Sequence, residues 1–295
     1  MGTQPAPSAP ACPGPDPVVR APRFAVPAGA TDTHAHVIGL PPEFPFVEQR
    51  SYTPPQASES SYLAMLDALG MARGVLVQVS VHGTDNRLLV RTLQRHPQRL
   101  RGVAVVAPDV DDKTLATLAA ANVRGLRINV LFGGGVGFAH IESLAAIAKE
   151  QGWHLQFLLD ARQLPELHPR LARLPVPFIV DHMGHMPASC GVNDPGFVAL
   201  VDLVRHHGCW IKLSGGYRIT SDHVRFSDTH VFARTLLQAA PDRMVWGSDW
   251  PHVAVTDRMP NTGELLDLLA EWVPDEALRN RILVDNPARL YGFAG

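Results

Sequence analysis

Three short segments place histidines and aspartates directly after apolar runs. They read Thr33-His34-Ala35-His36, Asp181-His182-Met183-Gly184-His185 and Ser248-Asp249-Trp250-Pro251. Imidazoles and carboxylates can transfer protons, activate water for attack on a carbonyl carbon, or ligate a divalent metal ion. Each segment alone has an ordinary structural explanation; Asp249, for example, could cap a helix or form a turn. Their joint occurrence after three apolar runs predicts a single active site.

The chain between these segments alternates between strand-like and helix-like patterns. Apolar runs rich in β-branched residues predict strands at 30–37, 74–80, 101–106, 123–130, 154–160, 177–183, 209–215 and 243–249. Helical spacing predicts helices at 58–69, 85–96, 112–121, 141–151, 161–173, 196–207, 229–239 and 262–272, and a last one at 275–290. Gly70, Gly152 and Gly208 stand where three of these helices should end.

Strict strand–helix alternation predicts the α/β class with a parallel sheet, and eight units predict one closed (β/α)8 TIM-type barrel. The alternative is an open doubly wound sheet. No glycine-rich phosphate loop follows the first strand, which favours the barrel. We expect the barrel to occupy residues 30–295 and residues 1–29 to form a proline-rich arm that extends over its surface.

Barrel enzymes carry their catalytic groups at the carboxyl ends of the strands, where the three segments lie. His34 and His36 are two residues apart, so both should face the barrel mouth. Asp181 and His182 are adjacent, so we expect at most one of them to enter the barrel. Arg127 alternates with Asn129 along the fourth strand, which favours an inward position.

The amino-acid composition limits the kinds of binding partner and the location to expect. The 295 residues carry a formal net charge of −2, so neither nucleic acid nor an anionic membrane is an expected partner. The three cysteines are odd in number and lack CxxC spacing, which favours a cytoplasmic location. No run of 18 or more apolar residues is present, so no membrane span is expected.

Taken together, the motifs resemble those of the amidohydrolase superfamily, in particular its lactonase branch, which includes the pyrone-dicarboxylate lactonases. The resemblance rests on the three segments above, on Lys212-Leu213-Ser214-Gly215, on the segments 78–86 and 124–129, and on the closing Asn286-Pro287-Ala288-Arg289-Leu290-Tyr291-Gly292. It implies a hydrolase that opens a carboxylate-bearing lactone in aromatic-compound or sugar-acid catabolism.

The resemblance also implies roles for individual residues. Asp249 would be the general base that activates water, with His34, His36 and His182 around the attacked carbonyl. The substrate would be contacted by Ser80 and His82 after the second strand, by His185, and by Arg127 and Arg218, whose guanidinium groups suit a carboxylate.

Three departures from the family pattern bear on metal and substrate, one of which is that His185 stands where the family carries an arginine. The usual histidine after the fifth strand and the bridging residue on the fourth are absent, so His34, His36, His182 and Asp249 would be the whole metal set. We therefore expect that no metal is required, although zinc or manganese could bind. The glycine-rich segment 133–137 replaces basic residues, which predicts fewer substrate carboxylates and a flexible loop over the mouth.

Two other functions share some of these features. A metal-dependent decarboxylase of hydroxylated aromatic acids would use the same barrel, the same His-x-His and the same final aspartate. Carbon dioxide release from a dihydroxybenzoate would distinguish it from ring opening of a lactone. A non-catalytic barrel that binds a small acid would have little need of an aspartate among histidines at its mouth.

Overall fold

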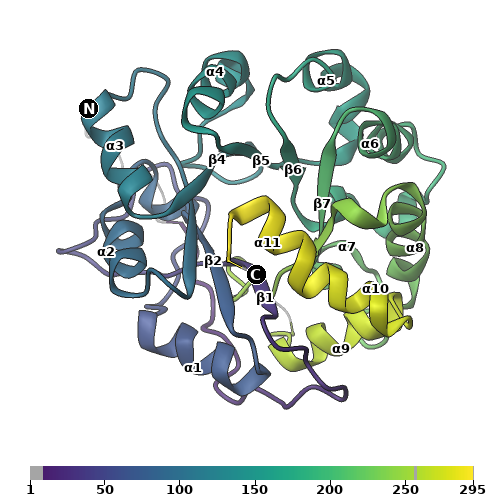
Figure 1. Ribbon diagram of the computed structural model, residues 1–295. Helices are drawn as coiled ribbons and strands as arrows, with labels where there is room; N and C mark the ends of the chain where they lie inside the picture. Colours follow the sequence, from purple (N-terminus) through teal and green to yellow (C-terminus); the bar gives the residue numbers. More distant parts are fainter. Residues whose placement is uncertain (1–8, 256–257, 295) are drawn as a thin grey trace, which may run out of the picture.

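A computed structural model describes residues 9–255 and 258–294 and has the expected barrel architecture (Figure 1). Eight parallel strands are hydrogen-bonded in chain order. They are β1 Thr31–Ala35, β2 Arg73–Val77, β3 Leu100–Ala104, β4 Val123–Asn129, β5 His154–Leu158, β6 Phe178–Val180, β7 Cys209–Leu213 and β8 Met244–Trp246. A parallel bridge between Ala35 and Trp250 joins the ends of β1 and β8 and closes the ring. This closure excludes the open doubly wound sheet.

An outer ring of helices surrounds the strands (Figure 1). Its members are α1 Glu59–Leu69, α2 Arg87–Arg95, α3 Asp112–Ala120, α4 Ile141–Gln151, α5 Leu164–Leu171, α6 Pro195–His206, α8 His230–Ala239 and α9 Thr262–Trp272. Gly70 and Gly152 end α1 and α4 with φ of +73° and +68°, the left-handed conformation that glycine adopts most easily. The short helix α7, Gly216–Ile219, was not predicted from the sequence.

The last predicted helix, 275–290, is broken into three parts: α10 Glu276–Asn280, a π-helical turn Arg281–Asp285, and α11 Asn286–Tyr291. Figure 1 shows α11 crossing the centre of the barrel in this view. Asn286 donates to the carbonyl oxygen of Met244 at the start of β8, so α11 covers the amino ends of the strands. The opposite end, where the strands finish, is left for the site.

Most strands end earlier than the sequence predicts. The apolar runs continue past β2, β6 and β8 by three residues each, into turns that line the mouth. An apolar run marks burial and not strand geometry, and these turns are as buried as the strands. Asp181, His182 and Asp249 therefore lie in turns just beyond the strands.

The expected arm runs along the outside of the barrel over residues 9–29, while its first eight positions lie outside the described residues. Cys12 N–H donates to the carbonyl oxygen of Thr53 at 3.0 Å, in the β1–α1 connection. Farther on, Arg20 N–H donates to Asn261 Oδ1 at 3.1 Å, and Arg23 pairs with Asp267 of α9. No helix in the described part of the chain is long and apolar enough to cross a bilayer.

Candidate active site

His34 of β1 and His36, directly after β1, lie at the base of the site. His34 and His36 are buried, with ring centres 5.1 Å apart. His36 Nδ1 lies 2.7 Å from the carbonyl oxygen of Val77. Because a carbonyl only accepts hydrogen bonds, Nδ1 carries the proton and Nε2 keeps its lone pair. Burial and the charge of Arg127 lower the pKa of His36 to about 4, so the ring is neutral at pH 7.

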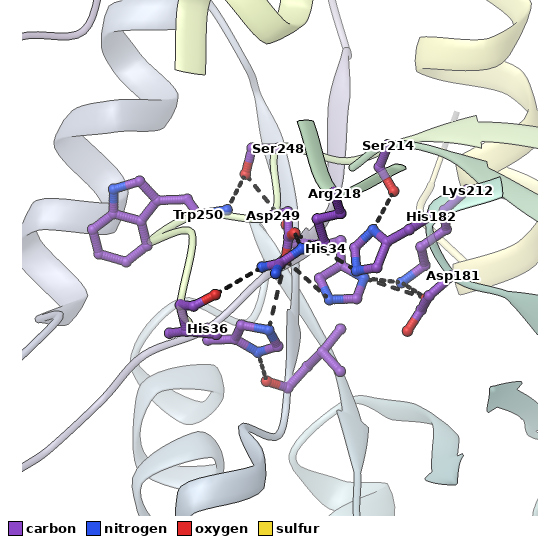
Figure 2. Close-up of polar contacts among 12 residues, drawn as sticks. His34, His36, Asp181, His182, Lys212, Ser214, Arg218, Ser248, Asp249 and Trp250 are labelled. Carbon is purple, nitrogen blue, oxygen red and sulfur yellow. Dashed lines mark hydrogen bonds and ion pairs between the residues drawn. The ribbon is translucent and has the colours of Figure 1, made fainter. Parts of the chain in front are cut away.

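Asp249 points at these histidines from the turn after β8 (Figure 2). Its φ is +61°, and its N–H donates to the carbonyl oxygen of His34 at 2.8 Å, which fixes the turn against β1. Carboxylate Oδ2 accepts from Tyr217 Oη at 2.6 Å and from Arg218 Nε at 2.5 Å. Around the carboxylate lie three Nε2 atoms: His34 at 3.8 Å, His36 at 4.0 Å and His182 at 3.6 Å. The structure thus brings the four residues of the expected site together.

The charge state of Asp249 follows from these neighbours. Burial would raise its pKa, but the charge and the hydrogen bond of the Arg218 guanidinium hold the pKa well below its usual range. The carboxylate is therefore ionised at neutral pH and only weakly basic while Arg218 is paired with it. An anion that drew Arg218 away would raise that basicity.

Asp181 and His182 both lie inside the barrel, so the expectation that at most one would enter is wrong. β6 ends at Val180, and His182 and Met183 have φ of +52° and +53°. This turn breaks the strand alternation on which the expectation depended. His182 Nδ1 lies 2.9 Å from Ser214 Oγ, while Asp181 is fully buried and accepts from Gln156 Nε2 at 3.0 Å.

Lys212 was not identified from the sequence as a site residue. Its Nζ donates to the Thr33 carbonyl oxygen and to Gln156 Oε1, each at 2.8 Å, and lies 3.1 Å from His34 Nδ1 and 3.6 Å from Asp181 Oδ1. Burial lowers its pKa to about 8, so it is an ammonium at pH 7. A lysine inside an apolar strand was the available signal.

The Lys212 ammonium decides which nitrogen of His34 carries the proton. Burial and Lys212 hold the pKa of His34 well below its usual value, so the ring is neutral. An ammonium has donors only, so Nδ1 accepts from it. Asp181 Oδ1 lies 3.4 Å from the same Nδ1 without a hydrogen-bond partner in the described part of the chain. The proton of His34 is therefore on Nε2, which faces Asp249.

A third buried carboxylate, Asp32, fixes the turn that carries Asp249. Ser248 donates to it twice, from N–H at 2.8 Å and from Oγ at 2.7 Å, and His34 N–H donates at 3.1 Å. Burial raises the pKa of Asp32 to about 6, against these hydrogen bonds. Asp32 thus links β1 to the turn after β8, a pairing of residues 216 positions apart that the sequence did not indicate.

The predicted substrate contacts occupy different depths. Arg218, His185 and Tyr217 line a cavity of about 290 Å³ at the mouth, with Phe132 and Arg258 also on its wall. Arg127 lies deeper; it donates to the Gln78 carbonyl oxygen at 3.1 Å and lies 3.7 Å from Asp181.

Ser80 and His82 are engaged by the β1–α1 connection. Ser80 Oγ lies 3.0 Å from Tyr52 Oη. The two ring nitrogens of His82 meet backbone groups of Gly39 and Pro45, each at 3.3 Å. In this arrangement His82 holds the connection in place.

The glycine-rich segment lies against this same connection. Gly133 N–H donates to Ser51 Oγ at 2.8 Å. Gly134 has a φ of +92°, and a Cβ there would overlap the carbonyl oxygen of Ser80. The segment therefore needs glycine to close over the end of β2.

Nitrogen and oxygen donors of the site match a divalent ion in type and spacing. His34, His36 and Asp249 each offer an atom, and these atoms lie within 4.8 Å of one another. His34 Nε2 is buried without a hydrogen-bond partner in the described residues, and His36 Nε2 has a free lone pair. Positive charge also lies beside the same atoms, from Arg218, Lys212 and the Nε2–H dipole of His34. This charge opposes the binding of a metal cation.

The chain matches known proteins over nearly its whole length. The family model described as amidohydrolase matches residues 31–293. A 4-sulfomuconolactone hydrolase of Hydrogenophaga intermedia is 37% identical, over 99% of this chain and 98% of that protein. A 2-pyrone-4,6-dicarboxylate hydrolase of Comamonas testosteroni is 38% identical over 92% of each. A D-galactarolactone isomerase of Agrobacterium fabrum is 30% identical, over 92% of this chain and 94% of that protein.

Proposed function

Because this chain belongs to the amidohydrolase family, we propose that it is a lactonase that hydrolyses the ring ester of a small lactone bearing a carboxylate or similar anionic group. The observation that carries the proposal is the ionised Asp249, buried among three imidazoles and paired with Arg218 at the wall of an open cavity. Two relatives with names of this kind support it, and so do the motifs that resemble the lactonase branch.

The proposal assigns a residue to each chemical step. Asp249 accepts a proton from water as the water oxygen attacks the lactone carbonyl carbon. The Nε2–H of His34 stabilises the negative charge that forms on the carbonyl oxygen. The tetrahedral intermediate collapses, the ring C–O bond breaks, and the proton on Asp249 passes to the leaving oxygen. The products are one hydroxyl or enol group and one carboxylic acid, which ionises at neutral pH and releases the second water proton to solvent.

The anionic group of the substrate has a second effect in this proposal. When it binds Arg218 at the cavity wall, it competes with Asp249 for the guanidinium. Asp249 then becomes a stronger base only when substrate is present. Arg127 supplies positive charge deeper in the barrel, and the glycines at 133–135 themselves bring no cationic side chain to the mouth, which favours a substrate with few carboxylates.

We also propose that no metal ion is required. His34, His36 and Asp249 would hold zinc or manganese if one were bound, and the ion would polarise the carbonyl and acidify water. The Lys212–His34 pair and Arg218 provide comparable positive character from the chain itself. We further propose a cytoplasmic location, from the cysteine pattern.

A panel of lactones tests the function. The panel contains lactones with no, one or two carboxylates and the methyl esters of the acidic ones. Hydrolysis of each is followed by proton release. We expect turnover of an acidic lactone and at least about 100-fold lower turnover by Asp249→Asn, the lower range for a general base. Carbon dioxide release from dihydroxybenzoates without any lactone turnover would favour the decarboxylase instead.

A further inference from the structure

A group of histidines around one carboxylate lies on the outer ring, away from the active site. His168 of α5 places Nε2 2.7 Å from Asp202 Oδ2 of α6. His207, directly after α6, places Nε2 3.6 Å from the same oxygen, and His206 Nε2 lies 3.9 Å from Oδ1. Figure 1 shows α5 and α6 side by side in the ring. Three imidazoles thus direct the same nitrogen at one aspartate.

This group is separate from the catalytic site in place and in chemistry. α6 runs antiparallel to the strands, so His206 and His207 at its end lie beside Cys209, at the start of β7. That is the face opposite the barrel mouth. In the described part of the chain, no lysine or arginine pairs with Asp202, so its charge is met only by the imidazoles.

The donor set fits a transition metal ion. Histidine nitrogen and aspartate oxygen are common zinc ligands, at about 2.0–2.2 Å from the ion. Atoms of His168, Asp202 and His207 already lie within 4.8 Å of one another, so small side-chain rotations would bring them around one ion. The side chains of His168 and His207 are 27% and 31% exposed, so an ion would reach them while two packed helices hold them in place.

A simpler explanation is a hydrogen-bonded His168–Asp202 pair with two bystanders. It accounts for the 2.7 Å contact, but not for two further imidazoles that turn Nε2 to the same carboxylate from the end of α6. The rings of His168 and His207 also lie edge to face, with centres 5.4 Å apart at 88°, so the two imidazoles are neighbours beside Asp202.

We propose that His168, Asp202 and His207, with His206 as a fourth ligand, form a zinc site that ties α5 to α6 and takes no part in catalysis. The active-site proposal is independent of it. The site would contribute one zinc equivalent in metal analyses, and catalysis would not depend on that ion.

Zinc titration of chelator-treated full-length protein tests the site, with binding followed by calorimetry. We expect the wild type to bind one equivalent and His168→Gln and His207→Gln each to bind zinc at least about 10-fold more weakly. His230→Gln, which removes a histidine that is 29% exposed and paired with Glu271, is the matched control and should bind as the wild type does. Lactone turnover should be the same in all four proteins.

Two results would overturn the proposal. One is a wild type that binds no zinc at up to 100 times the protein concentration. The other is zinc affinity that His168→Gln and His207→Gln leave unchanged while His36→Gln abolishes it, which would assign the ion to the barrel mouth. Circular dichroism of each variant verifies the fold, and both glutamines are uncharged and close in size to histidine.

Discussion

Asp249 is held by two hydrogen-bond donors and faced by three imidazoles, so its substitution affects charge more than packing. Asp249→Asn keeps the size of the side chain and its capacity to accept from Tyr217, but cannot take a proton from water. We expect kcat to fall at least about 100-fold. Steady-state kinetics on the acidic lactone measures this, and activity within a few-fold of the wild type would show that another group is the base.

The two arginines differ in depth, and so should their effects. Arg218→Met should raise KM strongly for an acidic lactone and much less for its methyl ester, because only the acid forms an ion pair with the arginine. Arg127→Met should show the same selectivity if the substrate reaches that depth. Equal losses on acid and ester would mean that these residues only support the structure.

Lys212 makes the reaction sensitive to high pH. Burial lowers its pKa to about 8. The neutral amine has two N–H groups for the acceptors Thr33 and Gln156, so only the protonated form has a third one for His34 Nδ1. As pH rises through about 8 the ammonium is lost, so kcat/KM should fall there. On the acid side the pKa values of His36 and His182 are about 4 and 3, and the pKa of Asp249 lies well below its usual range. The profile of kcat/KM should therefore stay flat down to about pH 6, where Asp32, which fixes the Asp249 turn, begins to take a proton. A flat profile from pH 7 to 10 would contradict this.

Removal of Lys212 should also cost stability. Lys212→Met leaves Asp181 buried without its ammonium neighbour, and breaking such a pair costs about 3–5 kcal/mol of unfolding free energy. The double variant Lys212→Met with Asp181→Asn removes both charges and should recover much of the loss. Urea unfolding of the three proteins measures this, and equal stability of single and double variants would rule out the charge pair.

At the residue scale, the site residues that could be predicted from the sequence are polar residues at the end of an apolar run. His34, His36, His182 and Asp249 were predicted this way, from their joint occurrence after three apolar runs. Lys212 and Asp32 were missed because each lies within a strand. The role of a polar residue there depends on the partners that it meets from strands distant in the sequence. Those pairings depend on the closed barrel and leave no local pattern.

At the scale of elements, the alternation of strands and helices was predictable and the strand ends were not. Residues with positive φ, such as His182 and Asp249, form the turns that follow the strands. Neither histidine nor aspartate marks such a turn in a sequence. Helix ends with glycine, as at Gly70, were predicted correctly because glycine alone relieves the strain.

The glycine-rich segment offers a matched test of an element. Gly134→Ala adds a Cβ at a φ of +92° that would overlap the Ser80 carbonyl oxygen, whereas a Cβ added at Gly137 would have no neighbouring atom within 4 Å. We expect Gly134→Ala to raise KM several-fold as the segment moves off the mouth, and Gly137→Ala to leave KM unchanged. Equal behaviour of the two variants would show that closure of this segment does not affect binding.

At the scale of the whole molecule, barrel closure brings three segments from β1, β6 and β8 to one carboxylate, and the surface histidines lie on the other face. Metal bound at the barrel mouth can therefore be distinguished by experiment from zinc bound at the surface histidines. After prolonged chelation we expect lactone turnover within about 2-fold of the untreated enzyme. Loss of activity on chelation with recovery on zinc addition, also in His168→Gln, would show that the barrel mouth needs a metal.

The central claim is that water opens a lactone, and the relative named D-galactarolactone isomerase makes rearrangement without water the sharpest alternative. Turnover of the acidic lactone in ¹⁸O-labelled water, followed by mass spectrometry of the product, distinguishes the two. The account predicts one ¹⁸O atom in the new carboxylate for each molecule converted, at a rate that Asp249→Asn lowers with turnover. Conversion to an isomer without incorporated ¹⁸O would contradict it.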